Sequence, residues 1–220
     1  MIERNISTAT HGRYLMAEAM PGSPLLVGFH GYAEAAEHEY QRVKSIPGAE
    51  HWVRVAVQGL HRFYRGRSSD VVASWMTSQG RELAIADNCG YVTSVVESVA
   101  AERSTSRILV FHGFSQGVAM AFRAAASSKF AVRGVIACGG DVPPELDTNS
   151  LARIQSVLLG RGTRDEWYTS EKFDDDERRL RAAGIRVQAI RFEGGHEWTP
   201  AFCRAAGDFL DTCRSPHPLG

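Results

Sequence analysis

The sequence lacks the features that mark membrane, secreted and nucleic-acid-binding proteins. Its 220 residues contain no run of 18 apolar residues, and the first residues, MIERNIS, form no apolar secretion signal. Lys and Arg together number 25, as do Asp and Glu, so the formal net charge is 0 and offers no excess of positive charge to bind nucleic acid or an anionic membrane. We therefore expect a cytoplasmic protein with no membrane span and no nucleic-acid partner, acting on small molecules.

The sequence is also poor in metal-ligand and disulfide patterns. Its four cysteines, Cys89, Cys138, Cys203 and Cys213, are widely spaced and form no Cys-x-x-Cys pair. The eight histidines include no His-Glu-x-x-His spacing, so the pattern indicates no metal site. We expect the cysteines to be buried free thiols; a disulfide between two of them is the alternative if the protein is exported. No repeat or low-complexity segment is present.

What the chain does contain is a regular alternation of short apolar runs and helix-compatible segments. Hydrophobic residues make up 44% of the sequence, enough for a sizeable core in one domain. The alternation predicts an α/β fold with a mostly parallel sheet and helices on both faces, whose ligand site lies at the carboxyl ends of the strands. We expect one domain over residues 1–214 and a disordered tail over 215–220. The predicted strands are 25–29, 52–57, 107–111, 134–138, 156–159 and 187–192; the predicted helices are 34–46, 81–102, 116–127, 170–183 and 200–213.

One stretch organises the rest: the apolar run that ends in Gly113-Phe114-Ser115-Gln116-Gly117. Gly-x-Ser-x-Gly between a strand and a helix is typical of a nucleophile elbow, in which the serine takes a strained conformation and projects its Oγ from the sheet. Gly113 and Gly117 remove side chains where strand and helix approach closely. The backbone N–H of Gln116 then lies at a helix N-terminus and can stabilise negative charge.

A second donor is expected after the strand at 25–29, where the chain reads His30-Gly31-Tyr32. A tight turn beside the elbow would direct the N–H of Tyr32 at the same point as that of Gln116, giving an oxyanion hole. The alternative is an ordinary strand-to-helix turn with His30 packed in the core.

Two further strands end near an acid and a histidine. Asp165 follows the run at 156–159, and His196 follows the run at 187–192. The order serine, acid, histidine is the one found in α/β-hydrolases, so Ser115, Asp165 and His196 are the predicted catalytic triad. Other assignments remain open: Glu166 or Asp141 could supply the acid, whereas His112 is expected to be packed.

Residues 58–80 are predicted to form a long irregular loop, rich in aromatic and basic side chains. Because long loops in compact domains are often functional, we interpret this one as a wall of the substrate pocket, with a solvated surface excursion as the alternative. The candidate pocket residues are Arg62, Phe63, Tyr64, Arg65, Trp75 and Met76. The arginines could meet a substrate carboxylate.

These motifs resemble the phospholipase/carboxylesterase family, which includes acyl-protein thioesterases. The residues that carry the resemblance are His30-Gly31, the pentapeptide around Ser115, Gly162 to Asp165, and Gly195-His196. The resemblance implies an α/β-hydrolase fold, no cofactor, the triad Ser115, Asp165 and His196, and an oxyanion hole from Tyr32 and Gln116. Val118 replaces a glycine that family members often carry, and the residues around Asp165 lack the family's Asp-Pro-Val-Val-Pro-like run.

We therefore expect a serine carboxylesterase that forms an acyl-serine intermediate. The short chain leaves no room for a large cap domain, so the pocket should be open and suit short or medium acyl chains. An acyl thioesterase, or a lysophospholipase or amide hydrolase, could use the same triad. A non-catalytic ligand-binding protein of the same fold is the alternative from another class. The oligomeric state is not predicted.

Overall fold

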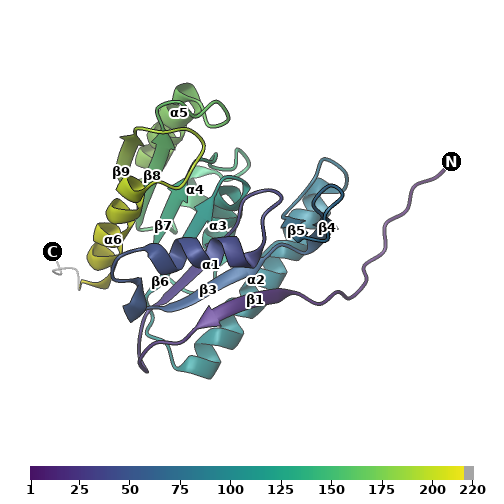
Figure 1. Cartoon of the computed structure of the whole chain (residues 1–220), viewed down its shortest axis with the longest axis horizontal. Helices are drawn as coiled ribbons and strands as arrows, with labels where there is room; N and C mark the ends of the chain where they lie inside the picture. Colours follow the sequence, from purple (N-terminus) through teal and green to yellow (C-terminus); the bar gives the residue numbers. More distant parts are fainter. Residues whose placement is uncertain (216–220) are drawn as a thin grey trace.

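A seven-stranded sheet forms the centre of the molecule in the computed structural model, which describes residues 1–215 (Figure 1). Its strand order is β1-β3-β2-β6-β7-β8-β9, and all neighbouring pairs are parallel except β1 with β3. The sheet strands are β1 (Arg13–Ala17), β2 (Leu25–Phe29), β3 (Val53–Gln58), β6 (Leu109–Phe114), β7 (Val132–Cys138), β8 (Ser156–Gly162) and β9 (Arg186–Phe192). The predicted α/β fold with a mostly parallel sheet is confirmed.

Helices cover both faces of the sheet, as Figure 1 shows. One core contains apolar residues from α2 (Arg81–Arg103), α3 (Gln116–Ser127) and α5 (Ser170–Ala182), together with strand residues such as Val27 and Phe111. The other contains residues from α1 (Ala36–Ser45) and α6 (Pro200–Arg214), with Val110 and Ile136 from the sheet. Because consecutive strand residues point to opposite faces, a strand buried on both sides must be apolar throughout, as Leu25–Phe29 is.

Two short helices complete the fold: η1 (Ala49–His51), a 3-10 turn before β3, and α4 (Thr148–Leu151), neither of which the sequence pattern predicted. The predicted strand 156–159 is too short, since β8 continues to Gly162. Among residues 1–215, the chain between sheet strands forms one or two helices at a time and one hairpin, in line with the prediction of no large cap domain. The predicted disordered tail lies outside the described residues except for Ser215, whose N–H donates to Asp211 O at the end of α6.

The prediction of an irregular loop at 58–80 is wrong. This segment forms an antiparallel hairpin of β4 (His61–Tyr64) and β5 (Val71–Ser74) that stands apart from the main sheet. Its two strands differ in burial: Val72 and Ala73 of β5 are buried, whereas the β4 side chains are mostly exposed. The hairpin docks through hydrogen bonds between Ala73 and the segment after β2, namely Ala33 N–H to Ala73 O and Ala73 N–H to Glu34 O. It therefore flanks the loop that carries Tyr32.

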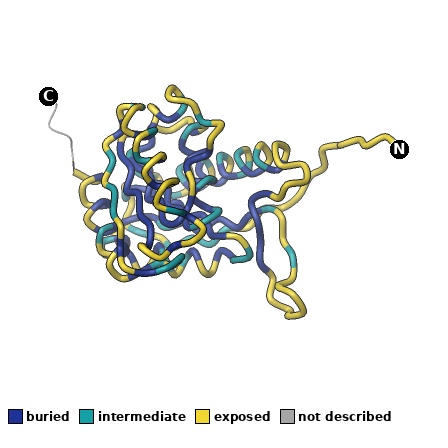
Figure 2. Tube along the Cα trace, turned by 90° about the horizontal axis from the view of Figure 1, so that it is seen from above, coloured by how far each residue is buried: buried dark blue, intermediate teal, exposed yellow. Residues whose placement is uncertain are grey.

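The chain begins with an exposed segment. Residues 1–12 are exposed throughout and extend away from the body of the molecule (Figures 1 and 2). All four cysteines are free: Cys138, Cys203 and Cys213 are buried, as predicted, whereas Cys89 is only half-buried. Burial raises the pKa of the Cys213 thiol to about 11. No helix among the described residues has the length and apolar character needed to cross a membrane.

Candidate active site

Ser115 occupies a strained turn between β6 and α3. Its backbone angles are φ 54° and ψ −121°, a conformation that costs a non-glycine residue on the order of 1–3 kcal/mol. The turn is possible because α3 starts directly against β2: a Cβ atom at Gly117 would lie 1.9 Å from the carbonyl oxygen of Phe29. Residue 117 must therefore be glycine for the helix to begin where it does, with the Ser115 hydroxyl at the edge of the sheet.

The side chains of Ser115, His196 and Asp165 form a continuous hydrogen-bonded chain. The distance from His196 Nε2 to Ser115 Oγ is 2.8 Å, and that from His196 Nδ1 to Asp165 Oδ2 is 2.9 Å. A buried carboxylate accepts, so we assign the Nδ1 proton to the bond with Asp165, which leaves Nε2 to accept from the hydroxyl. The structure thus brings together the three residues that the sequence predicted.

Backbone amides orient the acid. Asp165 Oδ1 accepts the N–H groups of Trp167 and Tyr168 at 2.9 Å and 3.0 Å, which leaves Oδ2 to face the imidazole. Beneath it, the Arg161 guanidinium donates to the carbonyl oxygens of Tyr168 and Asp165. The carboxylate is therefore held by the loop that carries it.

The loops bearing Asp165 and His196 are joined to each other. Thr163 N–H donates to Phe192 O and Arg164 N–H donates to Gly194 O, each at 2.8 Å. A Cβ atom at Gly162 would lie 2.5 Å from Gly194 O, so the close approach of the two loops depends on that glycine. Because β8 and β9 are neighbours in the sheet, the loops after them start side by side.

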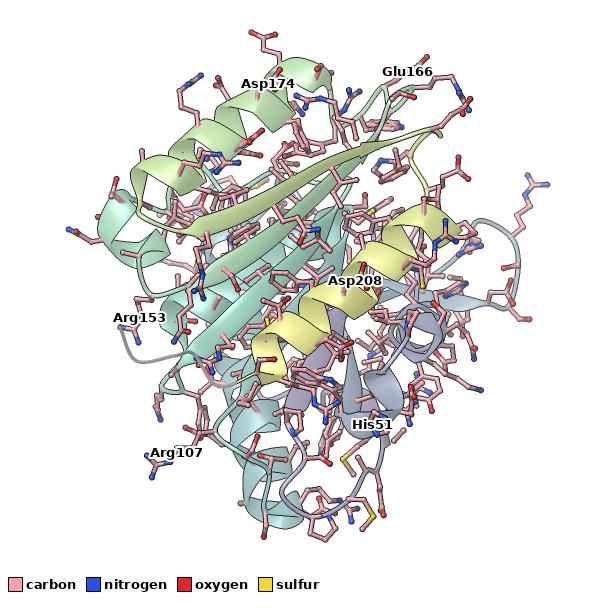
Figure 3. The ribbon with its side chains drawn as sticks, turned by 90° about the vertical axis from the view of Figure 1, so that its left-hand side faces the viewer. His51, Arg107, Arg153, Glu166, Asp174 and Asp208 are labelled. Atoms are coloured by element: carbon pink, nitrogen blue, oxygen red, sulfur yellow. The ribbon has the colours of Figure 1, made fainter. Side chains whose placement is uncertain are left out.

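The other candidate acids, Asp141 and Glu166, and the other candidate histidine, His112, make no hydrogen bond to His196 or Ser115. Asp141 follows β7 but is half-exposed and pairs with Lys172 at 3.2 Å, and Glu166 lies exposed on the outer surface beyond β8 (Figure 3). His112 is fully buried beside Glu39, with its ring edge-on to Trp198 at 4.9 Å. Of the residues considered, Asp165 alone contacts His196 as the acid of a relay would.

The two expected oxyanion donors flank Ser115. Gly31 contacts the serine so closely that a Cβ atom there would lie 3.3 Å from Ser115 Cβ, which brings the start of the Tyr32 loop to the elbow. Within residues 1–215 the backbone N–H groups of Tyr32 and Gln116 donate to no other protein group. The Gln116 side chain is held by the end of the hairpin, accepting from Trp75 N–H at 3.0 Å and donating to Met76 O at 3.1 Å.

His30, at the start of this loop, is packed in the core. Its ring is fully buried, Nδ1 lies 2.7 Å from Gly31 O, and Nε2 accepts the N–H of Gly59 at 3.0 Å. Burial lowers the pKa of this imidazole, so it is held neutral as a link between the two loops.

A buried ion network supports the same loop. Glu34 accepts the N–H of Gly31 at 2.8 Å and a hydrogen bond from Arg42 Nη1 at 2.7 Å. Arg42 also pairs with the buried Glu39 and lies 4.1 Å from the centre of the Phe114 ring. Burial raises the pKa of the Glu34 carboxyl, but the hydrogen bonds and charge of Arg42 and the Gly31 N–H outweigh it, so the net shift is downward. Glu34 is thus an ionised group that holds Gly31.

The space in front of the serine is a cavity of about 650 Å³. Its most exposed aromatic side chains are Trp167, 77% exposed, and Tyr32, 59% exposed. Its lining residues come from loops after β2, β6, β7, β8 and β9 and from the starts of α3 and α5: Tyr32, Ser115, Gln116, Ala119, Gly139, Gly140, Asp141, Trp167, Tyr168, Lys172 and His196. The predicted location at the carboxyl ends of the strands is therefore correct.

The predicted pocket residues do not line this cavity. Trp75 and Met76 are buried beneath it, where the segment they belong to holds Gln116. Phe63 reaches the cavity only indirectly, through its ring contact with Tyr32 at 5.8 Å, and Tyr64 is exposed. Arg62 and Arg65 line a separate cavity. The pairing of β4 with β5 fixes these directions, and the sequence pattern had given no hairpin there.

Several lining and supporting residues were missed by the sequence reasoning. Gly139 and Gly140 directly follow an apolar run, which is a signal that could have placed them at the site. Glu34, just before α1, and Arg42, in the last turn of α1, in contrast look like ordinary polar residues of a helical segment, and only their tertiary contacts reveal their role. Tyr168 is tied to the buried Asp176, which accepts hydrogen bonds from Tyr168 OH and Val142 N–H.

A strained serine at a strand-to-helix turn, in a mostly parallel sheet covered on both faces, defines the class of α/β-hydrolase-fold serine hydrolases. The sequence profile of the phospholipase/carboxylesterase family matches residues 69–214. The chain therefore belongs to the phospholipase/carboxylesterase family, and it is a hydrolase of the esterase or thioesterase type. No curated protein matches the sequence.

Solved structures agree with this fold. The Bacillus cereus carboxylesterase has a TM-score of 0.72 at 17% identity, covering 92% of this chain and 94% of its own. The esterase PE8 has a TM-score of 0.71 at 19% identity, covering 93% and 100%. Zea mays acyl-protein thioesterase 2 has a TM-score of 0.71 at 15% identity, covering 92% and 99%. At such identities the likeness shows the shared fold.

Proposed function

We propose that the protein is a carboxylesterase in which Ser115, His196 and Asp165 form the catalytic triad and the N–H groups of Tyr32 and Gln116 form the oxyanion hole. The observation that carries the proposal is the hydrogen-bonded chain from the Ser115 hydroxyl through His196 to Asp165. Geometry of this kind, with a strained serine and two free amide donors beside it, is what acyl transfer to a hydroxyl requires.

The reaction follows from these positions. Ser115 Oγ attacks the acyl carbon and its proton passes to His196 Nε2, while the two N–H groups stabilise the oxyanion. The tetrahedral intermediate collapses, the acyl–oxygen bond breaks, and His196 protonates the departing alkoxide. Water, deprotonated by His196, then attacks the acyl-serine; the acyl–Oγ bond breaks, His196 returns the proton to Ser115 Oγ, and the carboxylic acid is released. Asp165 fixes the imidazole tautomer and stabilises the imidazolium in both halves.

The cavity supports a substrate with a short or medium acyl chain. Its volume of about 650 Å³ falls within the range of small-molecule sites, roughly 300–1,000 Å³. The exposed Trp167 and Tyr32 rings offer apolar surface at its rim. A thioester has the same acyl carbon, so a thioesterase is the nearest alternative activity.

Covalent labelling tests the proposal directly. A fluorophosphonate probe should modify the folded wild-type protein at Ser115, and Ser115→Ala should abolish both labelling and turnover of p-nitrophenyl butyrate. The control is Ser127→Ala, which removes a hydroxyl from the far end of α3 and should change neither. A folded wild-type protein that takes no label and turns over no ester would instead indicate a ligand-binding protein of this fold.

Matched substrates separate the activities. Comparing kcat/KM for p-nitrophenyl esters, acyl thioesters and acyl amides of one acyl group shows which leaving group the enzyme prefers. We expect the oxygen esters to give the highest values. A clear preference for thioesters would replace the carboxylesterase assignment while leaving the triad in place.

A further inference from the structure

A second cavity lies next to the first, on the other side of the segment that carries Tyr32. It has a volume of about 560 Å³ and is bounded by the β4–β5 hairpin, β1 and the start of α1. Tyr32 lines the cavity at Ser115 and Ala35 lines this one. Three residues of extended chain span at most about 11 Å, so the two cavities are near neighbours along that segment.

Two arginines that line this second cavity have no carboxylate partner within residues 1–215. Arg62 donates to His11 O and Arg65 donates to Ala33 O, each at 2.7 Å, and both acceptors are neutral carbonyls. Within residues 1–215 neither guanidinium lies within 4.0 Å of a carboxylate oxygen. Arg13, by contrast, pairs with Glu37.

Such a pair of guanidinium groups is suited to an anion. The carbonyl bonds hold each side chain in place, which lowers the entropy lost when it binds, and leave further N–H donors for a ligand. Planar guanidinium groups match the oxygens of carboxylates and phosphates. Asp70 also lines the cavity and carries the opposing charge, so Arg62, Arg65 and Asp70 together leave one positive charge.

We propose that this second cavity binds an anionic group, a carboxylate or a phosphate, at the far end of the substrate's alcohol portion. The inference rests on the proposed function, because it requires the acyl carbon to lie at Ser115. The alcohol chain then passes over Tyr32, whose ring packs on Phe63 of the hairpin, and ends at Arg62 and Arg65. The preferred substrates are esters of hydroxy acids or of phosphorylated alcohols.

Three butyryl esters with the same six-carbon alcohol chain test this inference. The chain ends in a hydroxyl in the ester of hexane-1,6-diol, in a carboxylate in that of 6-hydroxyhexanoic acid, and in a phosphate in that of 6-hydroxyhexyl phosphate. We expect kcat/KM for at least one anionic ester to exceed that of the neutral ester by about tenfold, the size of one charge-assisted hydrogen bond. The carboxylate and phosphate arms show which anion is preferred.

Variants locate the effect. In Arg62→Gln/Arg65→Gln the ratio of anionic to neutral kcat/KM should fall to about one, and in Asp70→Asn it should rise. Arg67→Gln, which removes a charge from the same hairpin but not from the cavity lining, should leave the ratio unchanged. The preference should also weaken with added salt.

The outcomes separate the two proposals. Turnover of all three esters at equal kcat/KM, or an anionic preference that the double variant keeps or that Arg67→Gln also removes, would overturn the second-cavity site and leave the esterase intact. Failure to turn over any of the three, together with absent labelling of Ser115, would overturn the proposed function itself.

Discussion

The elbow at Ser115 and the β4–β5 hairpin flank the same backbone segment, residues 31–35, but different forces fix their geometry. The elbow is set by backbone crowding, with Gly117 pressed against Phe29 O, and β6 is buried over its whole length. The hairpin is held by two backbone hydrogen bonds to that segment and exposes most of β4. The groups proposed to react are thus fixed by main-chain packing, whereas the groups proposed to select substrates project from a surface element.

The largest expected effect concerns the relay at the elbow. Asp165→Asn should lower kcat by about 10⁴-fold, because an amide cannot hold the His196 tautomer that accepts from Ser115. Steady-state kinetics on p-nitrophenyl butyrate would measure the loss. Asp141→Asn, which removes the neighbouring carboxylate paired with Lys172, should stay within a few-fold of the wild type. Should Asp141→Asn prove the more damaging of the two, the acid would have to be reassigned.

A pair of glycine substitutions compares the two regions directly. Gly117→Ala should destabilise the fold by about 3 kcal/mol or more, because its Cβ would overlap a β2 carbonyl that cannot move. Gly66→Ala, in the hairpin turn at φ +56° with open space around it, should cost only about 1 kcal/mol of conformational strain. Thermal unfolding would report both, at roughly 2–4 °C per kcal/mol. Equal losses of stability in the two variants would contradict the view that the elbow, unlike the hairpin, is fixed by close contact between main-chain atoms.

A substitution at Glu34 tests whether its contacts with Gly31 and Arg42 hold the segment between the two regions in place. Glu34→Gln should reduce kcat about tenfold with little change in KM, because the loop carrying the Tyr32 N–H loses its charged anchor on Gly31 and Arg42. The matched control is Glu97→Gln on α2, which removes an exposed ion pair with Lys129 and should leave kcat and KM unchanged. A rise in KM alone would assign Glu34 to binding rather than to positioning the donor.

The same carboxylate has a predictable pH signature. Its pKa is lowered in the folded protein, so its stabilisation is full above the ordinary glutamate pKa of about 4.3 and is lost as pH falls through the lower folded value. The difference in unfolding free energy between wild type and Glu34→Gln should therefore be constant near neutral pH and shrink in acid. Urea unfolding at pH 7 and below pH 4 would measure it, and a difference that grows in acid would contradict the assignment.

The smallest effect lies at the edge of the second cavity. Burial raises the pKa of Tyr91, whose hydroxyl donates to Arg13 O at 2.7 Å, to about 12. The folded state therefore holds this proton more tightly, and the resulting stability is present below the unfolded pKa of about 10 and is lost as pH rises toward 12. Tyr91→Phe should lower the free energy of unfolding by about 1 kcal/mol at pH 8. Above pH 10, the free energy of unfolding of this variant should fall less steeply with pH than that of the wild type. Parallel curves for the two proteins would contradict this.

The contrast between the regions also explains what could be read from the sequence. Few sequences can form the elbow, because the close approach of strand and helix requires glycine at fixed positions. Asp165 and His196 are recognisable because they are polar residues that follow apolar strands. The convergence of these residues at one sheet edge then follows from a parallel sheet. The coarse architecture was predictable for the same reason: buried strands must be apolar throughout.

The pocket wall was not predictable from the same rules. Whether Arg62 and Arg65 face Ser115 or turn away depends on how the hairpin docks, and that is decided by Ala73 pairing with residues 33 and 34, far away in sequence. Likewise Glu39 carries no mark of burial in the sequence, because its carboxylate pairs with His112 on another element, whereas the predicted packing of His112 is confirmed. Long-range contacts between exposed or polar segments produce no periodic pattern in the amino-acid sequence, so they could not be predicted from it.

His196 follows β9, which is the last of the sheet strands within residues 1–215 and has only one neighbour in the sheet. A chain in which this edge strand has come loose would lack the imidazole that we propose as the base for Ser115. If the proposed triad is correct, incompletely folded molecules are inactive, and turnover reports only the fully folded ones.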